Sequence, residues 1–442
     1  TYEGSNESLP GNGGFFDQNN RDNKEANADI FLNFQKDFGS NWQLSGNIGA
    51  NYRRVDYNYS ALGTAQLTVP NWFDIANVKG TPTTDMYMSE YESNSIFASA
   101  NVGFMNQLFL DLTIRNDWSS TLPPANWSYP YWSASLGWIF TETFGLGGDI
   151  LSYGKLRGSY AKVGSDTSPY QILPVYNSVS PAYNGVTQFD FPSRMSPADL
   201  LPEQTASTEF GLEMKFFNNR LGFDVSYFDM VTTDQIMTVN ISTSTGFLTK
   251  AINAGEIETS GVEVALMGEI VRNSNFMWSA VLNWTKTQTV VNELAPGVTS
   301  YVLNSSWSPT TIEARPGEPF GQIYGIAYLR DENGNKLVED GYYQATSSPV
   351  VCGNTQADWI GSLNNLFKYK NLNANILVDV KWGGDIYSVT KWFGDYAGVT
   401  EATVKDNLRE TGAIADGIDV NTEQKNTVAV DPEYFFGDYW GK

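Results

Sequence analysis

Hydrophobic and polar residues alternate with a period of two along many segments of this chain. In residues 42–52 the even positions carry Trp, Leu, Gly, Ile, Ala and Tyr, and the odd positions carry Gln, Ser, Asn, Gly and Asn. This period predicts a β-strand with one apolar and one polar face. About a dozen strands are expected, most of them near the roughly 9–11 residues that a tilted strand needs to cross a bilayer. The clearest segments are 27–38, 42–52, 97–105, 108–116, 132–138, 209–216, 221–227, 262–266, 278–284, 359–370 and 372–382.

Short and long connections alternate between these segments. The short connections lie near residues 39–41, 106–107, 218–219, 273–275 and 371. The long connections span residues 54–94, 117–129, 165–206, 292–356 and 383–442. A meander with short turns at one end and long loops at the other is typical of an outer-membrane β-barrel. The fold expected is therefore all-β: a transmembrane, antiparallel, up-and-down β-barrel.

Alternation alone does not separate a membrane barrel from a soluble sandwich, which also has apolar and polar strand faces. Two further features favour the membrane. The polar faces carry mainly Asn, Ser, Gly and Thr, which suits a hydrated lumen better than an open, water-facing sheet. Aromatic residues gather at the strand ends, as in the girdles of membrane proteins: Trp42, Tyr52, Trp132, Trp138, Phe216, Trp278, Trp284 and Trp382.

Composition removes several classes of function. The net charge of −22 argues against nucleic-acid binding, because a phosphate backbone requires a basic surface. Cys352 is the single cysteine, so the chain can form no disulfide within itself. The absence of histidine excludes histidine bases, Ser-His-Asp triads and histidine-ligated zinc. No stretch approaches the roughly 18 apolar residues of a membrane helix. Only carboxylate, lysine or tyrosine chemistry stays open.

Several stretches resemble the SusC/RagA-like TonB-dependent transporters of the Bacteroidetes outer membrane. The resemblance is carried, in chain order, by DWSSTLPPANWSYPYWSASLGWIF (117–140), KLRGSYAKVGSDTSPYQ (155–171), LPEQTASTEFGLEMKFFNNRLGFDVSYFDMVTTDQI (201–236), NAGEIETSGVEVAL (253–266) and PGEPFGQIYGIAYLRDENGNKLVEDG (316–341). Such a family has an N-terminal plug domain and a plugged barrel of about 22 strands. We therefore expect residues 1–442 to be part of one barrel domain, with the plug domain and the closing strands outside this chain.

The resemblance also implies a function and partners. It implies active import of a bulky nutrient, an oligosaccharide or a peptide, across the outer membrane. TonB would act through the plug domain, a SusD-like surface lipoprotein would cover the loops, and lipid would surround the barrel. No cofactor and no enzymatic activity are expected. A passive porin or an adhesin barrel remains an alternative, as does a soluble carbohydrate-active enzyme with two carboxylates, although no pair of acidic residues is fixed by the sequence.

Five tryptophans in predicted loops are the candidate contacts for substrate or for the lipoprotein lid: Trp72, Trp118, Trp127, Trp307 and Trp392. Their rings could stack on a sugar or on a partner, and each could equally pack within its own loop. No catalytic, cofactor or metal-binding residues are assigned.

Other charged and loop residues have simpler interpretations. Arg115, Lys155 and Arg157 lie on polar strand faces, where we expect ion pairs with Asp or Glu on neighbouring strands or on the plug. Residues 331–335 (DENGN) lack the spacing of a calcium loop and favour a type I′ hairpin turn at Asn-Gly. Residues 400–411 suggest a short helix.

Overall fold

The computed structural model describes residues 14–64, 66–305 and 310–437. Its main feature is a 12-stranded antiparallel sheet with strand order β1-β2-β3-β4-β5-β6-β10-β11-β14-β15-β22-β23. Neighbouring strands follow one another along the chain, so the sheet is the up-and-down meander that the sequence predicts. The strands are β1 Phe16–Phe38, β2 Trp42–Thr64, β3 Thr83–Phe104, β4 Leu108–Ser119, β5 Ser128–Trp138, β6 Leu151–Ser165, β10 Glu203–Phe216, β11 Leu221–Thr233, β14 Glu256–Arg272, β15 Phe276–Glu293, β22 Trp359–Tyr369 and β23 Leu372–Trp382.

The connections carry only small elements. The additional strands are β7 Asn177–Tyr183, β8 Val186–Asp190, β9 Arg194–Met195, β12 Ile236–Asn240, β13 Thr249–Asn253, β16 Tyr301–Ser305, β17 Thr311–Ala314, β18 Gln322–Gly325, β19 Leu337–Glu339, β20 Tyr342–Tyr343, β21 Val350–Asn354 and β24 Ile418–Asp419. The helices are α1 Phe140–Phe144, α2 Val389–Tyr396, α3 Leu408–Thr411 and α4 Pro432–Gly437, with 3-10 turns η1 Ile75–Asn77, η2 Thr243–Thr245, η3 Glu401–Thr403 and η4 Lys405–Asn407. Within the described residues, no helix has the length and apolar character needed to cross a membrane.

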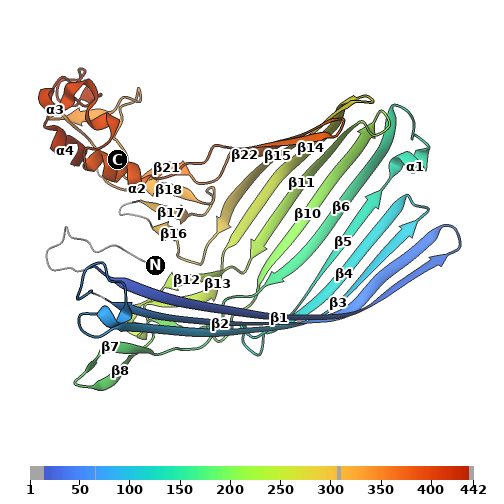
Figure 1. The fold of residues 1–442 in the computed structure, drawn as a ribbon, viewed down its shortest axis with the longest axis horizontal. Helices are drawn as coiled ribbons and strands as arrows, with labels where there is room; N and C mark the ends of the chain where they lie inside the picture. The colour runs from blue at the N-terminus through green and yellow to red at the C-terminus, as the bar shows by residue number, and fades with distance from the viewer. Residues whose placement is uncertain (1–13, 65, 306–309, 438–442) are drawn as a thin grey trace. The chain divides into compact units, whose positions relative to one another are not determined.

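The chain forms two compact units, which are described separately. The first comprises residues 1–138, 158–206 and 234–254, and the second comprises residues 139–157, 207–233 and 255–442. In the first unit, strands β1 to β5 lie side by side in chain order (Figure 1). In the second unit, β11, β14, β15, β22 and β23 form the corresponding series.

One face of the first unit is apolar and exposed. Residues paired across antiparallel strands point to the same face, so the register defines an apolar row: Leu32, Ile48, Ala98, Ile114 and Trp132. Leu32 is 72% exposed, Ile48 60% and Ile114 58%. A soluble sandwich would bury such a face against a second sheet. The exposed apolar row instead fits a surface that faces lipid.

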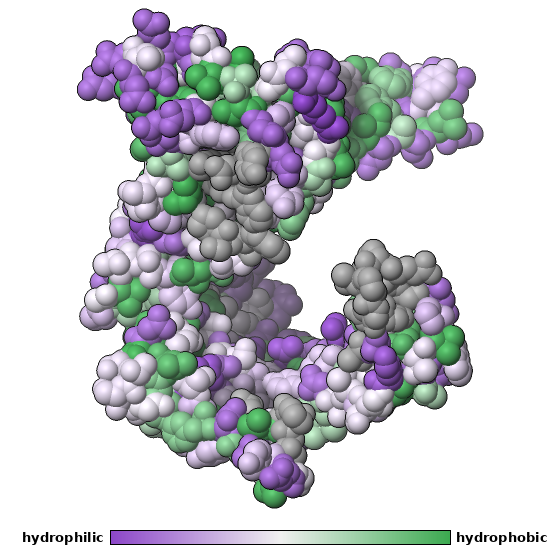
Figure 2. All heavy atoms as spheres, turned by 90° about the vertical axis from the view of Figure 1, so that its left-hand side faces the viewer, coloured by the Kyte–Doolittle hydropathy of each residue, from purple (hydrophilic) through white to green (hydrophobic). Residues whose placement is uncertain are grey.

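The second unit repeats this arrangement. Its apolar row is Phe223, Leu266, Leu282, Leu363 and Val378. Leu266, Leu363 and Val378 are likewise exposed. Away from the strands the surface is mixed, and the side drawn in Figure 2 shows hydrophilic and hydrophobic residues interspersed.

Aromatic residues border the apolar face of the first unit at both ends. At the short turns the register aligns Phe38, Trp42, Phe104, Leu108 and Trp138, and the rings of Trp42 and Phe104 lie 4.5 Å apart. Toward the loops it aligns Tyr52, Asn94 and Trp118. From Leu108 to Trp118 the strand runs about 33 Å, or about 25 Å along the membrane normal at the usual tilt. This matches the height of the apolar band of an outer-membrane barrel.

The loop predicted over residues 54–94 is shorter than expected. The strands β2 and β3 continue to pair as far as Gly63 and Thr83, so only residues 65–82 connect them. β1 is also longer than its predicted segment and begins at Phe16. Residues 83–93 carry polar side chains on both faces, and in residues 55–61 the alternation is reversed, because Val55, Tyr57, Tyr59 and Ala61 occupy the face that is polar in residues 42–52. A strand that leaves the bilayer meets water on both faces, so neither face has to stay apolar, while its backbone hydrogen bonds persist.

Two details of the loops also differ from expectation. The hairpin at Asp331 is present, but the predicted type I′ turn is wrong. Gly334 has a positive φ of 83° and donates its N–H to Asp331 O at 3.0 Å, whereas Asn333 is not left-handed. The Asp331 carboxylate accepts hydrogen bonds from the backbone N–H groups of Asn333 and Asn335, which favours a type I turn. The side-chain hydrogen bond from Asn335 lowers the pKa of this carboxyl.

The helix suggested over residues 400–411 is interrupted. The segment forms η3, η4 and α3, and Asp406 and Asn407, the last two residues of η4, have φ values of 53° and 56°. Asp and Asn tolerate this left-handed conformation better than most residues, and it ends a helix.

Candidate functional site

The polar face of β1–β5 carries rows of amides and hydroxyls. One row is Asn33, Asn47, Ser99, Thr113 and Ser133, and the next is Gln35, Ser45, Asn101, Asp111 and Ser135. The hydroxyl oxygens of Thr113 and Ser133 are 2.6 Å apart and share a hydrogen bond, and Asn101 donates to Asp111. A hollow of about 490 Å³ lies over both rows on β1–β4. These groups can hydrogen-bond water, sugar hydroxyls or a peptide backbone.

Toward the loop end, the same face holds a buried polar group that we call the Asp117 cluster: Ser95, Arg115, Asp117, Tyr129 and Tyr131. Asp117 is only 8% exposed. Its carboxylate accepts hydrogen bonds from Arg115 Nε at 2.7 Å and from the Tyr131 hydroxyl at 2.8 Å. Arg115 Nη2 also donates to Ser95 Oγ at 2.7 Å. Arg115 is thus in an ion pair, but its partner lies on its own strand and not, as expected, on a neighbouring strand or on the plug.

Asp166, which directly follows β6, ties its loop to the ends of β3 and β4. Its carboxylate accepts hydrogen bonds from the Tyr91 hydroxyl at 3.0 Å and from the Ser119 hydroxyl. Ser119 is 2% exposed. The buried side chains Leu122, Tyr129 and Leu200 pack together in this unit and form its small hydrophobic core. The polar face therefore ends in a hydrogen-bonded rim, which consists of the Asp117 cluster together with Tyr91, Ser119 and Asp166.

Gly164 in β6 makes room for the ring of Tyr129 in this rim. A Cβ atom at position 164 would lie 2.6 Å from Tyr129 Cδ2. We expect Gly164→Ala to lower the free energy of unfolding by about 1–2 kcal/mol, because the buried ring has no free space to enter. Denaturant unfolding of the protein in lipid vesicles measures this. The matched control is Gly103→Ala, where the nearest atom is 3.5 Å away; an equal loss there would contradict the prediction.

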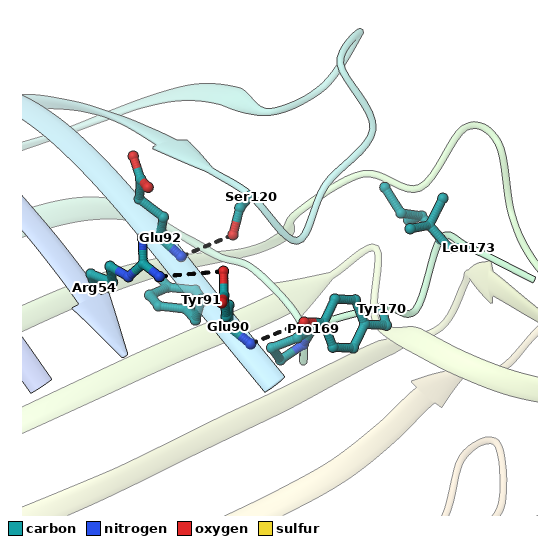
Figure 3. A pocket seen from close by; sticks show the side chains of 9 residues that line it. Arg54, Glu90, Tyr91, Glu92, Ser120, Pro169, Tyr170 and Leu173 are labelled. Carbon is teal, nitrogen blue, oxygen red and sulfur yellow. Dashed lines mark hydrogen bonds and ion pairs between the residues drawn. The ribbon is translucent and has the colours of Figure 1, made fainter. Parts of the chain in front are cut away.

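A pocket of about 270 Å³ adjoins the rim (Figure 3). Arg54, Glu90 and Glu92 supply its charges, and Arg54 Nη2 lies 2.9 Å from Asp56 and 3.4 Å from Glu90. The other lining residues are Tyr91, Ser120, Pro169, Tyr170, Ile172 and Leu173. With two carboxylates and one guanidinium that is already paired, the pocket suits a cation better than an anion.

In the second unit, Arg157 is paired as the sequence predicts. Its Nη2 lies 2.8 Å from Asp224 and its Nε 3.5 Å from Glu209. Lys155 forms no ion pair within the part of the chain that the structure describes, and a partner on the plug stays a prediction.

The structure does not gather the candidate tryptophans into one site. Trp118 lies in β4 and not in a loop, since that strand extends to Ser119. It pairs with Asn94 and Ser128 and shares the apolar face with Ile114, so it belongs to the aromatic border and points away from the polar face. Trp118 and Trp127, expected in one loop, therefore lie in a strand and in a loop, although the Ser119 N–H donates to Trp127 O at 2.9 Å.

The remaining tryptophans occupy different settings. Trp72 and Trp127 lie in loops and are 54% and 50% exposed. Trp392 lies in α2, where its ring is 4.4 Å from that of Phe393. Trp307 falls outside the described residues. A role for these side chains in binding substrate or lid stays a prediction.

Comparisons with known proteins identify the fold. Residues 1–407 match the family model described as "TonB dependent receptor-like, beta-barrel". TonB-dependent receptor P3 of Formosa agariphila is 25% identical over 82% of this chain and 39% of its own length. TonB-dependent receptor SusC of Bacteroides thetaiotaomicron is 24% identical over 66% of this chain and 31% of its own length.

Solved structures agree with this result. The structure of the RagAB peptide transporter superposes with a TM-score of 0.73 at 18% identity, covering 94% of this chain and 47% of that one. The chain spans well under half of the length of TonB-dependent receptor P3 and of SusC. The resemblance to SusC/RagA-like transporters is confirmed. The chain belongs to the TonB-dependent receptor-like β-barrel family, which is a family of outer-membrane proteins.

Proposed function

We propose that the whole protein imports a bulky nutrient, an oligosaccharide or a peptide, across the outer membrane with energy delivered by TonB. The observation that carries the proposal is the two-faced sheet. Its exposed apolar rows suit lipid, while the opposite face of β1–β5 offers amides and hydroxyls over a hollow of about 490 Å³. Such a wall would let a polar cargo pass beside the plug.

The proposed partners follow from the relatives. One relative is named SusC, and a structural neighbour is titled the RagAB peptide importer. We propose that a SusD-like lipoprotein covers the loops of this chain and that TonB acts through a plug domain. Trp72 and Trp127 are exposed loop residues suited to contact the lid or the cargo.

Two other functions are less well supported. A soluble carbohydrate-active enzyme would not expose its apolar strand faces to solvent. A passive porin or an adhesin would share the barrel wall but would not depend on TonB.

Uptake measurements in cells test the proposal. In a strain that carries the whole transporter and its neighbouring lipoprotein, we expect labelled oligosaccharide or peptide to accumulate, and we expect deletion of tonB to abolish this. A control immunoblot shows that the barrel still reaches the outer membrane. Uptake that continues unchanged without TonB would assign the protein to the passive porins and contradict the proposal.

A further inference from the structure

The strand β3 has one free edge over its first half. Residues 93–104 of β3 pair with both β2 and β4. β4 ends at Ser119, opposite Ser93, so among the residues that the structure describes, residues 83–92 of β3 pair with β2 alone. Unpaired strand edges present rows of backbone donors and acceptors, and proteins normally cover or blunt them.

Two hydrogen bonds fix the direction of these backbone groups. Glu92 N–H donates to Ser120 Oγ at 2.9 Å, and Glu90 N–H donates to the Tyr170 hydroxyl at 3.1 Å. Both N–H groups thus point away from β2. Because the direction alternates along an antiparallel strand, the N–H and C=O groups of Thr84, Met86 and Met88 point the same way.

This segment, the β3 edge, is open. Within the described residues, no backbone hydrogen bond reaches Thr84, Met86 or Met88 from the side opposite β2. Met86 is 68% exposed, Tyr87 49% and Met88 56%. The edge therefore exposes three large side chains beside Asp85, carries no lysine or proline, and is long enough to pair with several residues of another chain.

The pocket beside the rim begins where the β3 edge ends. Glu90 and Glu92 line it, and Tyr170 and Ser120 close it (Figure 3). Both glutamates lie at even positions of β3, the parity of Asn94 and Trp118 and not of the polar face. Its one guanidinium, that of Arg54, already faces the carboxylates of Asp56 and Glu90. A chain paired along residues 84–88 would carry its next residues toward this pocket, where an ammonium or guanidinium group would complement the carboxylates.

We propose that the β3 edge is a β-addition site for an extended peptide cargo, with a basic side chain or the amino terminus of that peptide in the pocket lined by Glu90 and Glu92. The inference rests on the proposed import of a nutrient. Of the two proposed kinds of cargo, oligosaccharide and peptide, it favours the peptide. An oligosaccharide lacks the alternating N–H and C=O groups that a strand edge recognises. The acidic pocket further selects peptides with a positive charge.

A pair of peptides tests the backbone part of the site without changing the protein. The probe is a ten-residue peptide of alternating Thr and Val with one Lys, titrated into the whole transporter in detergent. The second peptide has the same sequence but carries methyl groups on the backbone nitrogens of alternate residues. We expect methylation to weaken binding by about tenfold or more, because two or more hydrogen bonds are lost. Equal affinity of the two peptides, or no binding of either, would overturn the proposal.

Variants of the protein test the location. Met86→Pro removes an N–H that the ladder with β2 does not use, so the strand should persist. We expect it to weaken the unmethylated peptide about tenfold, whereas Met86→Ala should change affinity less than about twofold. Glu92→Gln should weaken the Lys peptide but not its norleucine analogue. Migration of unheated protein in gels verifies that each variant is folded, and unchanged affinity of folded Met86→Pro would exclude this edge.

Other occupants of the edge give distinct results. A photoreactive residue at position 86 that crosslinks to the lipoprotein, undisturbed by excess peptide, would assign the edge to the lipoprotein and refute the proposal. Uptake assays on the same strains separate the two levels of inference. If uptake depends on TonB but the variants bind the peptide as well as the unaltered protein does, only the proposed binding site at the β3 edge is refuted. If uptake does not depend on TonB, the proposed function is refuted.

Discussion

Leu112→Arg is expected to lower the free energy of unfolding in lipid by about 2–4 kcal/mol and to reduce the amount of protein in the outer membrane. Leu112 lies near the middle of β4, on the apolar face, and pairs with Ala100 and Ala134. Its side chain is 42% exposed and, in the membrane, would lie against lipid. A guanidinium there must leave water or distort the bilayer. Denaturant titration in phosphatidylcholine vesicles and quantification of outer-membrane fractions measure the two effects.

Thr113→Arg is the matched control, one residue further along the same strand. Thr113 lies on the polar face, beside Ser133 and under the hollow of the first unit. An arginine there can remain hydrated, so we expect a loss below about 1 kcal/mol. Equal losses for the two variants would contradict the assignment of one face to lipid and the other to the lumen.

Asp117→Ala is expected to cost about 2–3 kcal/mol of folding free energy. The substitution removes the acceptor of Arg115 Nε and of the Tyr131 hydroxyl at a position that is 8% exposed. Deleting one partner of a buried ion pair leaves the other charge uncompensated. The Arg115 side chain is 35% exposed, so water recovers part of the loss and keeps the effect below that of a fully buried pair. The same unfolding titration measures it.

Two further variants show whether this loss comes from the cluster. Asp111→Ala removes an exposed carboxylate of the same strand and face and should cost less than about 1 kcal/mol. Adding Arg115→Met to Asp117→Ala should restore part of the stability, since no unpaired charge remains. If Asp111→Ala were as damaging as Asp117→Ala, the Asp117 cluster would have no special role.

The strands of the main sheet could be predicted because the patterns that specify them lie within short stretches of the sequence. Alternation over ten or so residues decides which face meets lipid, and an asparagine-rich turn decides where a hairpin reverses. Two turns show this directly: Met105 and Asn106 both have positive φ, as do Asn218 and Asn219, which gives the type I′ geometry that matches the strand twist. The plug domain and the barrel of about 22 strands were expected only from the resemblance to the family.

The rim and the strand lengths could not be predicted from the same pattern. Asp166 bonds to Tyr91 and Ser119, which are distant in sequence, so no local period marks the contact. Beyond the bilayer, backbone pairing extends β2 and β3, and the apolar face of residues 42–52 is not continued there, so the phase of the pattern does not mark the extension. The prediction that Trp118 lies in a loop was wrong for the same reason. Trp118 is the last aromatic residue of β4, which extends to Ser119. Carrying the parity of β4 two residues further would have put Arg115 and Asp117 on one face.

The tight turns also affect how such a chain can change during evolution. Residues with positive φ fix the register of a hairpin at its closed end, as Met105 and Asn106 do between β3 and β4. The loops at the other end are then not needed to set the strand register. Doubling the length of a loop costs only about 0.6 kcal/mol of loop-closure free energy. Loops can therefore be lengthened, exchanged or recombined between relatives while the wall stays constant. Sequence changes are therefore tolerated best in the part of the protein that folding constrains least.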